Sequence, residues 1–212
     1  MNTLAKQIES LNNELMQQVP VAVLEIFEKS ITALKSENIE TKIAEIGDQL
    51  VPFSLPNAAN QLIYSKNILE KGKMILAFFR GSWCPYCNLE LRALQENLAK
   101  ITHKNVTLLA VSPQSTDHNT QLIEKYLLTF DVLTDKDNLL AHQLGIRFEL
   151  QEFALPTYEA MGINLEEFNQ NNDNTLPVPA IFVVDCDGSI CYKFADADYR
   201  NRLDIDALLH VL

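Results

Sequence analysis

The sequence predicts an α/β protein with a mixed central sheet of about five strands flanked by helices, preceded by an N-terminal helical extension. Two observations carry this prediction. Short apolar runs of strand length alternate with segments of helical periodicity through the middle of the chain. Two further apolar runs near the end are joined by a tight turn. The alternation is typical of parallel strands with right-handed crossovers, and the joined pair is typical of an antiparallel hairpin.

The N-terminal region differs from the rest of the chain in the spacing of its apolar residues. Over residues 1–40 apolar residues recur at helical spacing and are interrupted at Val19-Pro20, which predicts two amphipathic helices. With 212 residues, 47% of them hydrophobic, the chain can bury the core of one domain. We therefore divide it into a helical extension, residues 1–42, and a core domain, residues 43–212. The helices are expected to cover one face of the core, and a homodimer contact is the alternative.

The core elements follow in a regular order. A small hairpin pairs residues 53–55 with 62–64 across a turn at Pro56-Asn57, and the run MILAFF, residues 74–79, has the composition of a strand buried on both faces. A helix with one apolar face then follows, reaching Ile101. The later segments are strand 106–111, helix 116–128, strand 130–133, helix 138–144, a less regular stretch 146–178, the hairpin strands 180–185 and 189–195, and a closing helix 203–212.

Charge and hydropathy exclude several classes of partner. The formal net charge is -11, from 17 Lys and Arg against 28 Asp and Glu, which argues against nucleic acid and against an anionic membrane. No apolar run approaches the roughly 18 residues of a membrane span, and the N-terminus lacks the continuous apolar segment of a secretory signal. We therefore predict a cytoplasmic protein with no membrane partner.

The segment RGSWCPYCN, residues 80–88, carries the strongest chemical signal. Cys84 follows the predicted buried strand, and Pro85 suits the first position of a helix, so Cys84 is expected near the helix N-cap. The positive end of the helix dipole would then lower the pKa of an exposed Cys84 thiol. Cys87 lies one turn further, towards the buried face. An activated thiol with a sheltered neighbour is the geometry of thiol–disulfide exchange.

Zinc binding is the main alternative use of such a pair. A structural zinc site needs four ligands, and the remaining cysteines, Cys186 and Cys191, lie on a predicted hairpin while the histidines are scattered singly. Cys186 and Cys191 are therefore read as small apolar or incidental residues. We predict no metal and no cofactor.

Several segments together show a family resemblance. GDQLVPFSLP (47–56), FFRGSWCPYCNLELRAL (78–94), LLAVSPQ (108–114), FDVLTDKDN (130–138) and LPVPAIFVVDCDG (176–188) resemble, in this order, the peroxiredoxin-like branch of the alkyl hydroperoxide reductase and thiol-specific antioxidant (AhpC/TSA) family. The resemblance implies a thioredoxin-like fold. Trp83 before the pair and Pro179 before a later strand are similar to that fold's arrangement, in which a Trp precedes the cysteines and a cis-proline faces them.

Two positions depart from the family pattern. Cys84 stands where the family has Thr, and Cys87 stands where it has the cysteine that attacks peroxide. The family's arginine before the strand 180–185 is replaced by Pro179. Arg80, beside the motif, could supply the missing positive charge, or it could be an ordinary surface or ion-paired arginine. Trp83 is expected to pack the motif and shield the thiol.

The resemblance implies an antioxidant thiol peroxidase that reduces hydrogen peroxide or organic hydroperoxides through the Cys84/Cys87 pair. The resulting disulfide would be reduced by thioredoxin or a similar dithiol donor. A thiol–disulfide oxidoreductase is the alternative, with Cys84 attacking, Cys87 resolving and Pro179 lining the substrate groove. A zinc-bound or structural module is a lesser one. Which cysteine attacks first stays open in the sequence.

Overall fold

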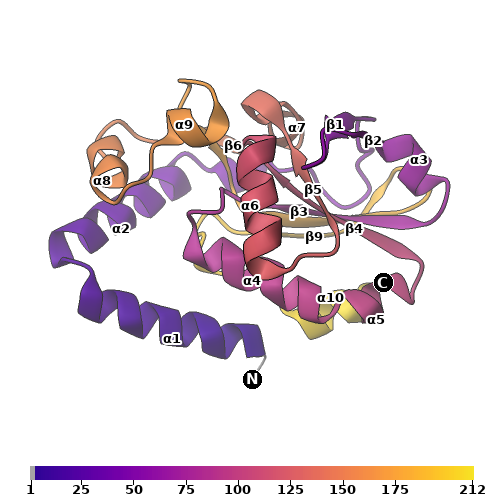
Figure 1. Ribbon diagram of the computed structural model, residues 1–212, viewed down its shortest axis with the longest axis horizontal. Helices are drawn as coiled ribbons and strands as arrows, with labels where there is room; N and C mark the ends of the chain where they lie inside the picture. Colours follow the sequence, from indigo (N-terminus) through magenta and orange to yellow (C-terminus); the bar gives the residue numbers. More distant parts are fainter. Residues whose placement is uncertain (1–2) are drawn as a thin grey trace.

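The computed structural model describes residues 3–212, and its core is a five-stranded mixed sheet in the order β5-β4-β3-β8-β9 (Figure 1). Strands β3, β4 and β5 run parallel, whereas β8 is antiparallel to both β3 and β9. The predicted fold class is confirmed. The strands are β3 (Lys73–Phe78), β4 (Val106–Ser112), β5 (Asp131–Thr134), β8 (Ala180–Val184) and β9 (Ile190–Ala195).

The cysteine motif follows the C-terminal end of the central strand β3. Its residues after Lys73 are all buried, as the run MILAFF predicts for a strand covered on both faces. Phe78 is in register with Val111 of β4 and Ala180 of β8, and the Phe79 N–H still donates to the Val111 carbonyl. The chain therefore leaves the sheet at its centre, directly before the motif.

One face of the sheet is covered by helices that include the one carrying the cysteines. Ile75 and Ala77 of β3 point into the apolar cluster of this face. The predicted long helix after the motif divides at Asn97, whose backbone (φ -105°, ψ 5°) leaves the helical conformation. The helices on this face are α1 (Thr3–Gln18), α4 (Pro85–Glu96), α5 (Leu98–Thr102), α6 (Thr116–Tyr126) and α10 (Ile205–Val211).

The other face of the sheet is covered by shorter elements around the alternate residues of β3, Met74, Leu76 and Phe78. The small hairpin predicted before β3 is confirmed, and it pairs Ser54 with Tyr64. The elements on this side are α2 (Val21–Ser36), the 3-10 turn η1 (Ile39–Lys42), β1 (Ser54–Pro56), β2 (Leu62–Tyr64), α3 (Ser65–Leu69) and α7 (Leu139–Gln143). The 3-10 turn η2 (Lys136–Asn138) directly precedes α7 in the chain.

The two N-terminal helices break at Val19-Pro20 as predicted, but they do not cover a single face. Leu4 of α1 is buried in the cluster around α4, whereas Leu34 of α2 is buried in the cluster on the opposite face. In Figure 1 the two helices form an angle at the left side of the molecule, with α1 starting below α4 and α2 lying beside α8 (Leu155–Ala160). The motif therefore lies between them and the core.

The stretch 146–178, which the sequence predicts to be irregular, contains short regular elements. Strands β6 (Arg147–Glu149) and β7 (Thr175–Pro177) form an antiparallel ribbon, and between them lie α8 and α9 (Leu165–Asn169). This segment and α2 share an apolar cluster that includes Phe27, Tyr158 and Trp83. Within residues 3–212, the helices are all too short or too polar to cross a membrane.

Candidate active site

The cysteine motif forms a tight turn that is held from both sides. Cys84 is the N-cap of α4 and Pro85 its first residue, as predicted. Ser82, two residues before Cys84, donates its backbone N–H to Gln114 Oε1 at 2.7 Å, and its carbonyl accepts a hydrogen bond from Asn88 Nδ2 at 2.8 Å. These two buried amides fix the turn that carries Cys84 from the end of β3 to the start of α4.

Cys84 and Cys87 face each other as free thiols. Their Sγ atoms are 2.9 Å apart, within hydrogen-bond distance, and the two side chains are only 1% and 0% exposed. The sequence predicts an exposed Cys84, and this prediction is wrong: α1, α2 and the segment around α8 surround the motif. Both sulfurs are therefore shielded from bulk water.

A buried ion pair lies behind Cys87. Arg202, from the loop before α10, donates from Nη2 to Cys87 Sγ at 3.3 Å and from Nη1 to Glu90 Oε2 at 2.6 Å. Both charged side chains are almost completely buried. Glu90 follows Pro85 by more than one turn of α4, so its position is decided by this pair and not by the helix dipole.

The surroundings place the negative charge on Cys87. Burial raises the pKa of the Cys87 thiol, but the hydrogen bond from Cys84 and the positive charges of Arg202 and Arg80 outweigh burial and lower the pKa to about 5. Burial and the contact with Cys87 raise the pKa of Cys84. The predicted lowering at Cys84 is therefore wrong. With Cys87 ionised, the Cys84 S–H is the donor between them.

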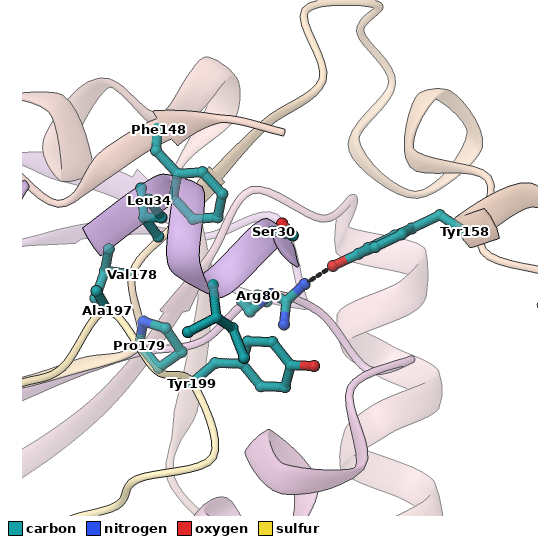
Figure 2. Close-up of a pocket in the computed structure, with 10 residues that line it drawn as sticks. Ser30, Leu34, Arg80, Phe148, Tyr158, Val178, Pro179, Ala197 and Tyr199 are labelled. Carbon is teal, nitrogen blue, oxygen red and sulfur yellow. Dashed lines mark hydrogen bonds between the residues drawn. The ribbon is translucent and has the colours of Figure 1, made fainter. Parts of the chain in front are cut away.

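Arg80 is neither a surface residue nor an ion-paired one, the two ordinary roles considered from sequence. It is 3% exposed and donates to the Tyr158 hydroxyl (Figure 2). Its guanidinium carbon lies 4.2 Å from the centre of the Tyr199 ring and 4.9 Å from that of Trp83. Among residues 3–212 no carboxylate forms a salt bridge with it, and its Nε has no hydrogen-bond partner. A buried cation thus faces the cysteine pair within an aromatic cage.

The two remaining candidate residues, Trp83 and Pro179, lie in different surroundings. Trp83 is half-buried and meets Tyr158 edge-to-face, with ring centres 5.6 Å apart, so it packs the motif as expected. Pro179 follows a trans peptide bond and lines a cavity of about 10 Å³ behind Arg80, together with Tyr199 (Figure 2). Pro179 does not line the larger cleft beside Cys84.

That cleft, called here the Cys84 cleft, has a volume of about 1020 Å³. Its walls come from α1, α2, the motif, the end of α8 and residues 198–201. Cys84 lines it and Cys87 does not. Of the two cysteines, Cys84 is therefore the nearer to a molecule in the cleft.

The other two cysteines lie elsewhere. Cys186 is exposed in the turn between β8 and β9, and Cys191 of β9 lies 3.5 Å from the Val183 carbonyl through its sulfur. Within the part of the chain that the structure describes, no three His, Cys, Asp or Glu side chains are grouped as metal ligands. The four cysteines are thus not brought together as the zinc alternative requires.

Three residues of the site were missed from sequence: Arg202, Tyr158 and Tyr199. None lies within a recognisable motif. The signal that could have pointed to the arginine is local, since DADYRNR (196–202) places Arg202 directly before an apolar helix in a polar loop. Polarity alone does not show which of its arginines turns inward.

The fold and the site define a thioredoxin-fold thiol oxidoreductase, with two cysteines at the start of the helix after the central strand. The chain belongs to the AhpC/TSA family, whose model matches residues 46–193. A bcp-named peroxiredoxin of Buchnera aphidicola is 30% identical over 100 residues, which are 47% of this chain and 63% of that protein. Peroxiredoxin Bcp of Escherichia coli is 24% identical over 159 residues, 75% of this chain and 90% of that one.

The fold comparison agrees with the family. The crystal structure of peroxidoxin BcpB from Mycobacterium tuberculosis superposes with a TM-score of 0.62 at 16% identity, covering 79% of this chain and 95% of that one. The predicted family resemblance is therefore confirmed. Both N-terminal helices and Arg202 lie outside the residues that the family model matches.

Proposed function

We propose that this protein is a thiol peroxidase in which Cys87 attacks the peroxide and Cys84 completes the disulfide. The observation that carries the proposal is the pair of contacts at the Cys87 sulfur, from Arg202 Nη2 at 3.3 Å and from Cys84 Sγ at 2.9 Å, which favour its thiolate. A thiolate, and not a thiol, is the nucleophile towards peroxide. The membership of the AhpC/TSA family and the peroxiredoxin relatives support the same reaction.

The reaction balances with the groups present. The Cys87 thiolate attacks the terminal oxygen of ROOH and the O–O bond breaks, leaving Cys87–SOH and an alkoxide. The Cys84 thiol gives its proton to that alkoxide, forming ROH, and becomes a thiolate. It then attacks the Cys87 sulfenic acid, forming the Cys84–Cys87 disulfide and releasing hydroxide. Cys84 thus acts as hydrogen-bond donor, proton donor and resolving thiol in turn.

Two arginines supply the positive charge that the family pattern places where this chain has Pro179. Arg202 contacts the attacking sulfur, and Arg80 adds an uncompensated charge nearby. Fixed charges in a dry site interact more strongly with a developing alkoxide than they would in water. The pair therefore favours both the thiolate and the departure of the leaving oxygen.

The cycle closes when an external thiol returns two electrons to the disulfide. The resemblance implies thioredoxin or a similar dithiol donor for this step. Such a cycle needs a reducing thiol pool, so we place the protein in the cytoplasm. The proposed cycle uses no cofactor, because two electrons pass from the two sulfurs to the peroxide and the donor thiol then returns two to the disulfide. A homodimer through the N-terminal helices remains a prediction.

The order of attack is tested by a peroxide pulse on two single variants followed by mass spectrometry. Cys84→Ser is expected to consume one peroxide and hold a sulfenic acid on Cys87, trapped with dimedone. Cys87→Ser is expected to leave the peroxide intact. The matched control is Cys191→Ser, which lies outside the site and is expected to behave like wild type. A sulfenic acid trapped on Cys84 in the Cys87→Ser protein would assign the attack to Cys84 instead.

One observation favours the second candidate, a thiol–disulfide oxidoreductase: Cys84 lines the cleft and Cys87 does not. In that reaction Cys84 attacks a substrate disulfide, and Cys87 resolves the mixed disulfide. Comparison of peroxide consumption with reduction of a protein disulfide by the wild type separates the two. Reduction of the protein disulfide without any reaction with hydrogen peroxide or cumene hydroperoxide would establish the second candidate.

A further inference from the structure

We propose that the Cys84 cleft binds a low-molecular-weight thiol without net negative charge, which reduces the Cys84–Cys87 disulfide by attacking Cys84. The inference rests on the proposed function, because the disulfide is the product of the peroxidase cycle. It assigns the reductant a site and a chemical class, a small thiol in place of the thioredoxin-type donor that the family resemblance implies, and it makes the N-terminal helices part of that site.

Access decides which sulfur is attacked. Cys84 lines the cleft, whereas Cys87 is fully buried beneath it, with Arg202 and Glu90 behind it. Thiol–disulfide exchange needs the incoming thiolate in contact with the sulfur that it attacks. Cys84, which borders the cleft, is therefore the nearer of the two cysteines to an incoming thiolate.

The same direction of attack gives the better leaving group. When the disulfide breaks at Cys84, the departing sulfur is Cys87, which Arg202 contacts at 3.3 Å through a guanidinium N–H. A thiol that is stabilised as its anion leaves faster. Access and leaving-group stability therefore both favour attack on the sulfur of Cys84.

The shape of the cleft favours a small reductant. A volume of about 1020 Å³ is at the upper end of typical small-molecule sites. Cys84 itself is only 1% exposed, and α1 is held against the motif by the Tyr86 hydroxyl, which donates to Asn12 Oδ1 at 2.5 Å. A folded dithiol protein would have to displace α1 and α2 to bring its sulfur to bonding distance. A small thiol enters without that displacement.

The charges at the mouth of the cleft favour a neutral or cationic thiol. Glu25 and Glu28 are exposed on its α2 wall, and Asp198 lies opposite. Two cations also line the cleft: Arg200 binds Glu28 at 2.8 Å and Asp198 at 2.7 Å, and Arg80, only 3% exposed, lies in the buried part of the wall and not at the mouth. Since the chain as a whole carries a net charge of -11, an anionic thiol is repelled at long range as well.

The exchange balances as two thiolate attacks. The first thiolate, RS⁻, forms a bond to Cys84 Sγ, the Cys84–Cys87 bond breaks, and Cys87 leaves as its thiolate. A second RS⁻ attacks the R-bearing sulfur of the mixed disulfide, producing RSSR and the Cys84 thiolate, which takes up a proton. Two thiols are oxidised and the enzyme disulfide is reduced by two electrons.

The test uses protein oxidised to the disulfide with diamide, so that it does not depend on peroxide. Reduction by cysteamine, 2-mercaptoethanol and mercaptoacetate is followed by the fluorescence of Trp83, the one tryptophan of the chain. Each rate is divided by the rate of the same thiol with a small model disulfide, which removes differences in intrinsic reactivity. The normalised rates are expected to fall from cysteamine through 2-mercaptoethanol to mercaptoacetate, and the spread is expected to shrink at high salt.

A charge-reversal variant with a matched control ties the ranking to the cleft. Glu25→Lys is expected to lower the ratio of the cysteamine rate to the mercaptoacetate rate by about threefold or more, because it reverses a charge at the mouth. Glu124→Lys makes the same change on an exposed face of α6 that does not line the cleft, and is expected to leave the ratio within error. Cystamine added to reduced Cys87→Ser is expected to form its adduct on Cys84.

Three results would overturn the inference: equal normalised rates for the three thiols, the same change of ratio in both lysine variants, or much faster reduction by thioredoxin with its reductase and NADPH than by any small thiol at equal concentration. The last result would assign the step to a dithiol protein. Peroxide consumption by the reduced protein is measured separately. Its absence would overturn the proposed peroxidase, whereas failure of the thiol ranking overturns only the reductant site.

Discussion

Arg202 donates a hydrogen bond to the sulfur of Cys87 across 115 positions of sequence. The contact joins the loop before the last helix to the first turn of α4, and the same guanidinium holds the buried Glu90. The charge that stabilises the thiolate thus comes from beyond the residues matched by the family model, which end at residue 193.

Replacing Arg202 with Met should therefore weaken the nucleophile. Without the guanidinium the pKa of Cys87 rises towards its ordinary range, because burial raises it and less opposes that effect. The second-order rate with hydrogen peroxide at pH 7 is expected to fall by about tenfold or more. Stopped-flow fluorescence and the thiolate absorbance at 240 nm measure the rate and the pKa independently.

The control for that variant is the double change Arg202→Met with Glu90→Gln. The single variant leaves a carboxylate buried without its partner, a change that typically costs about 3–5 kcal/mol of unfolding free energy. The double variant removes that charge, so it should recover most of the stability in urea unfolding and none of the peroxide rate. Recovery of the rate along with stability would show that Arg202 acts only as a structural residue.

The pH dependence follows from the direction of the Cys87 shift. Because its pKa is lowered to about 5, the thiolate is nearly complete at pH 7 and is lost as the pH falls through about 5. The rate of alkylation by iodoacetamide and the rate with peroxide should fall together below that pH and stay level from about pH 6 to 8. A midpoint near the ordinary thiol range, with Cys84 reacting first, would contradict the assignment of the charge.

Arg80→Met is expected to separate activity from stability. The side chain is buried without a carboxylate partner among residues 3–212, so its removal relieves the desolvation of a charge while losing the contacts with Tyr158 and Tyr199. The unfolding free energy should stay within about 1 kcal/mol of wild type or rise. The peroxide rate should fall, but less than in Arg202→Met, because Arg80 does not donate its side chain to the sulfur. A large loss of stability would show that the aromatic cage needs the cation.

Gln114 is expected to be a positioning residue for the motif. Its fully buried amide accepts from the Ser82 N–H at 2.7 Å and donates to Asn119 at 2.7 Å. Gln114→Met keeps the volume but leaves the Ser82 N–H without its acceptor and leaves Asn119 Oδ1 with only the longer bond from Ser112 at 3.5 Å, which should cost about 1–3 kcal/mol. Urea unfolding measures the cost, with Gln121→Met on the exposed side of α6 as the control, and a shifted pKa of Cys87 would distinguish positioning from simple support.

The sheet and the placement of the cysteines could be predicted because both depend on local patterns. The run MILAFF predicts a buried strand, and Pro85 marks the first turn of α4 independently of tertiary contacts. Strands β6 and β7, with three residues each, are too short to show a period, so the ribbon between residues 146 and 178 escaped prediction.

The electrostatics of the site could not be predicted for a different reason. The helix dipole acts on Cys84 in any chain with this motif, but the pKa values were decided by burial and by Arg202, which tertiary packing brings to Cys87. Glu90 lies on the predicted helix after the motif, but nothing in the sequence indicates that Arg202 is its partner. Arg80 was singled out for its charge, whereas its aromatic surroundings come from Tyr158 and Tyr199, far away in the chain.

The 2.9 Å between the two sulfurs has a consequence for damage by the substrate itself. A sulfenic acid that waits for a distant partner is exposed to a second peroxide and irreversible oxidation to sulfinic acid. In this protein the partner thiol is already in contact, one helical turn away, so disulfide formation needs no unfolding of α4 and competes as an intramolecular step. An enzyme built in this way is expected to keep working through bursts of peroxide that would inactivate one with separated cysteines.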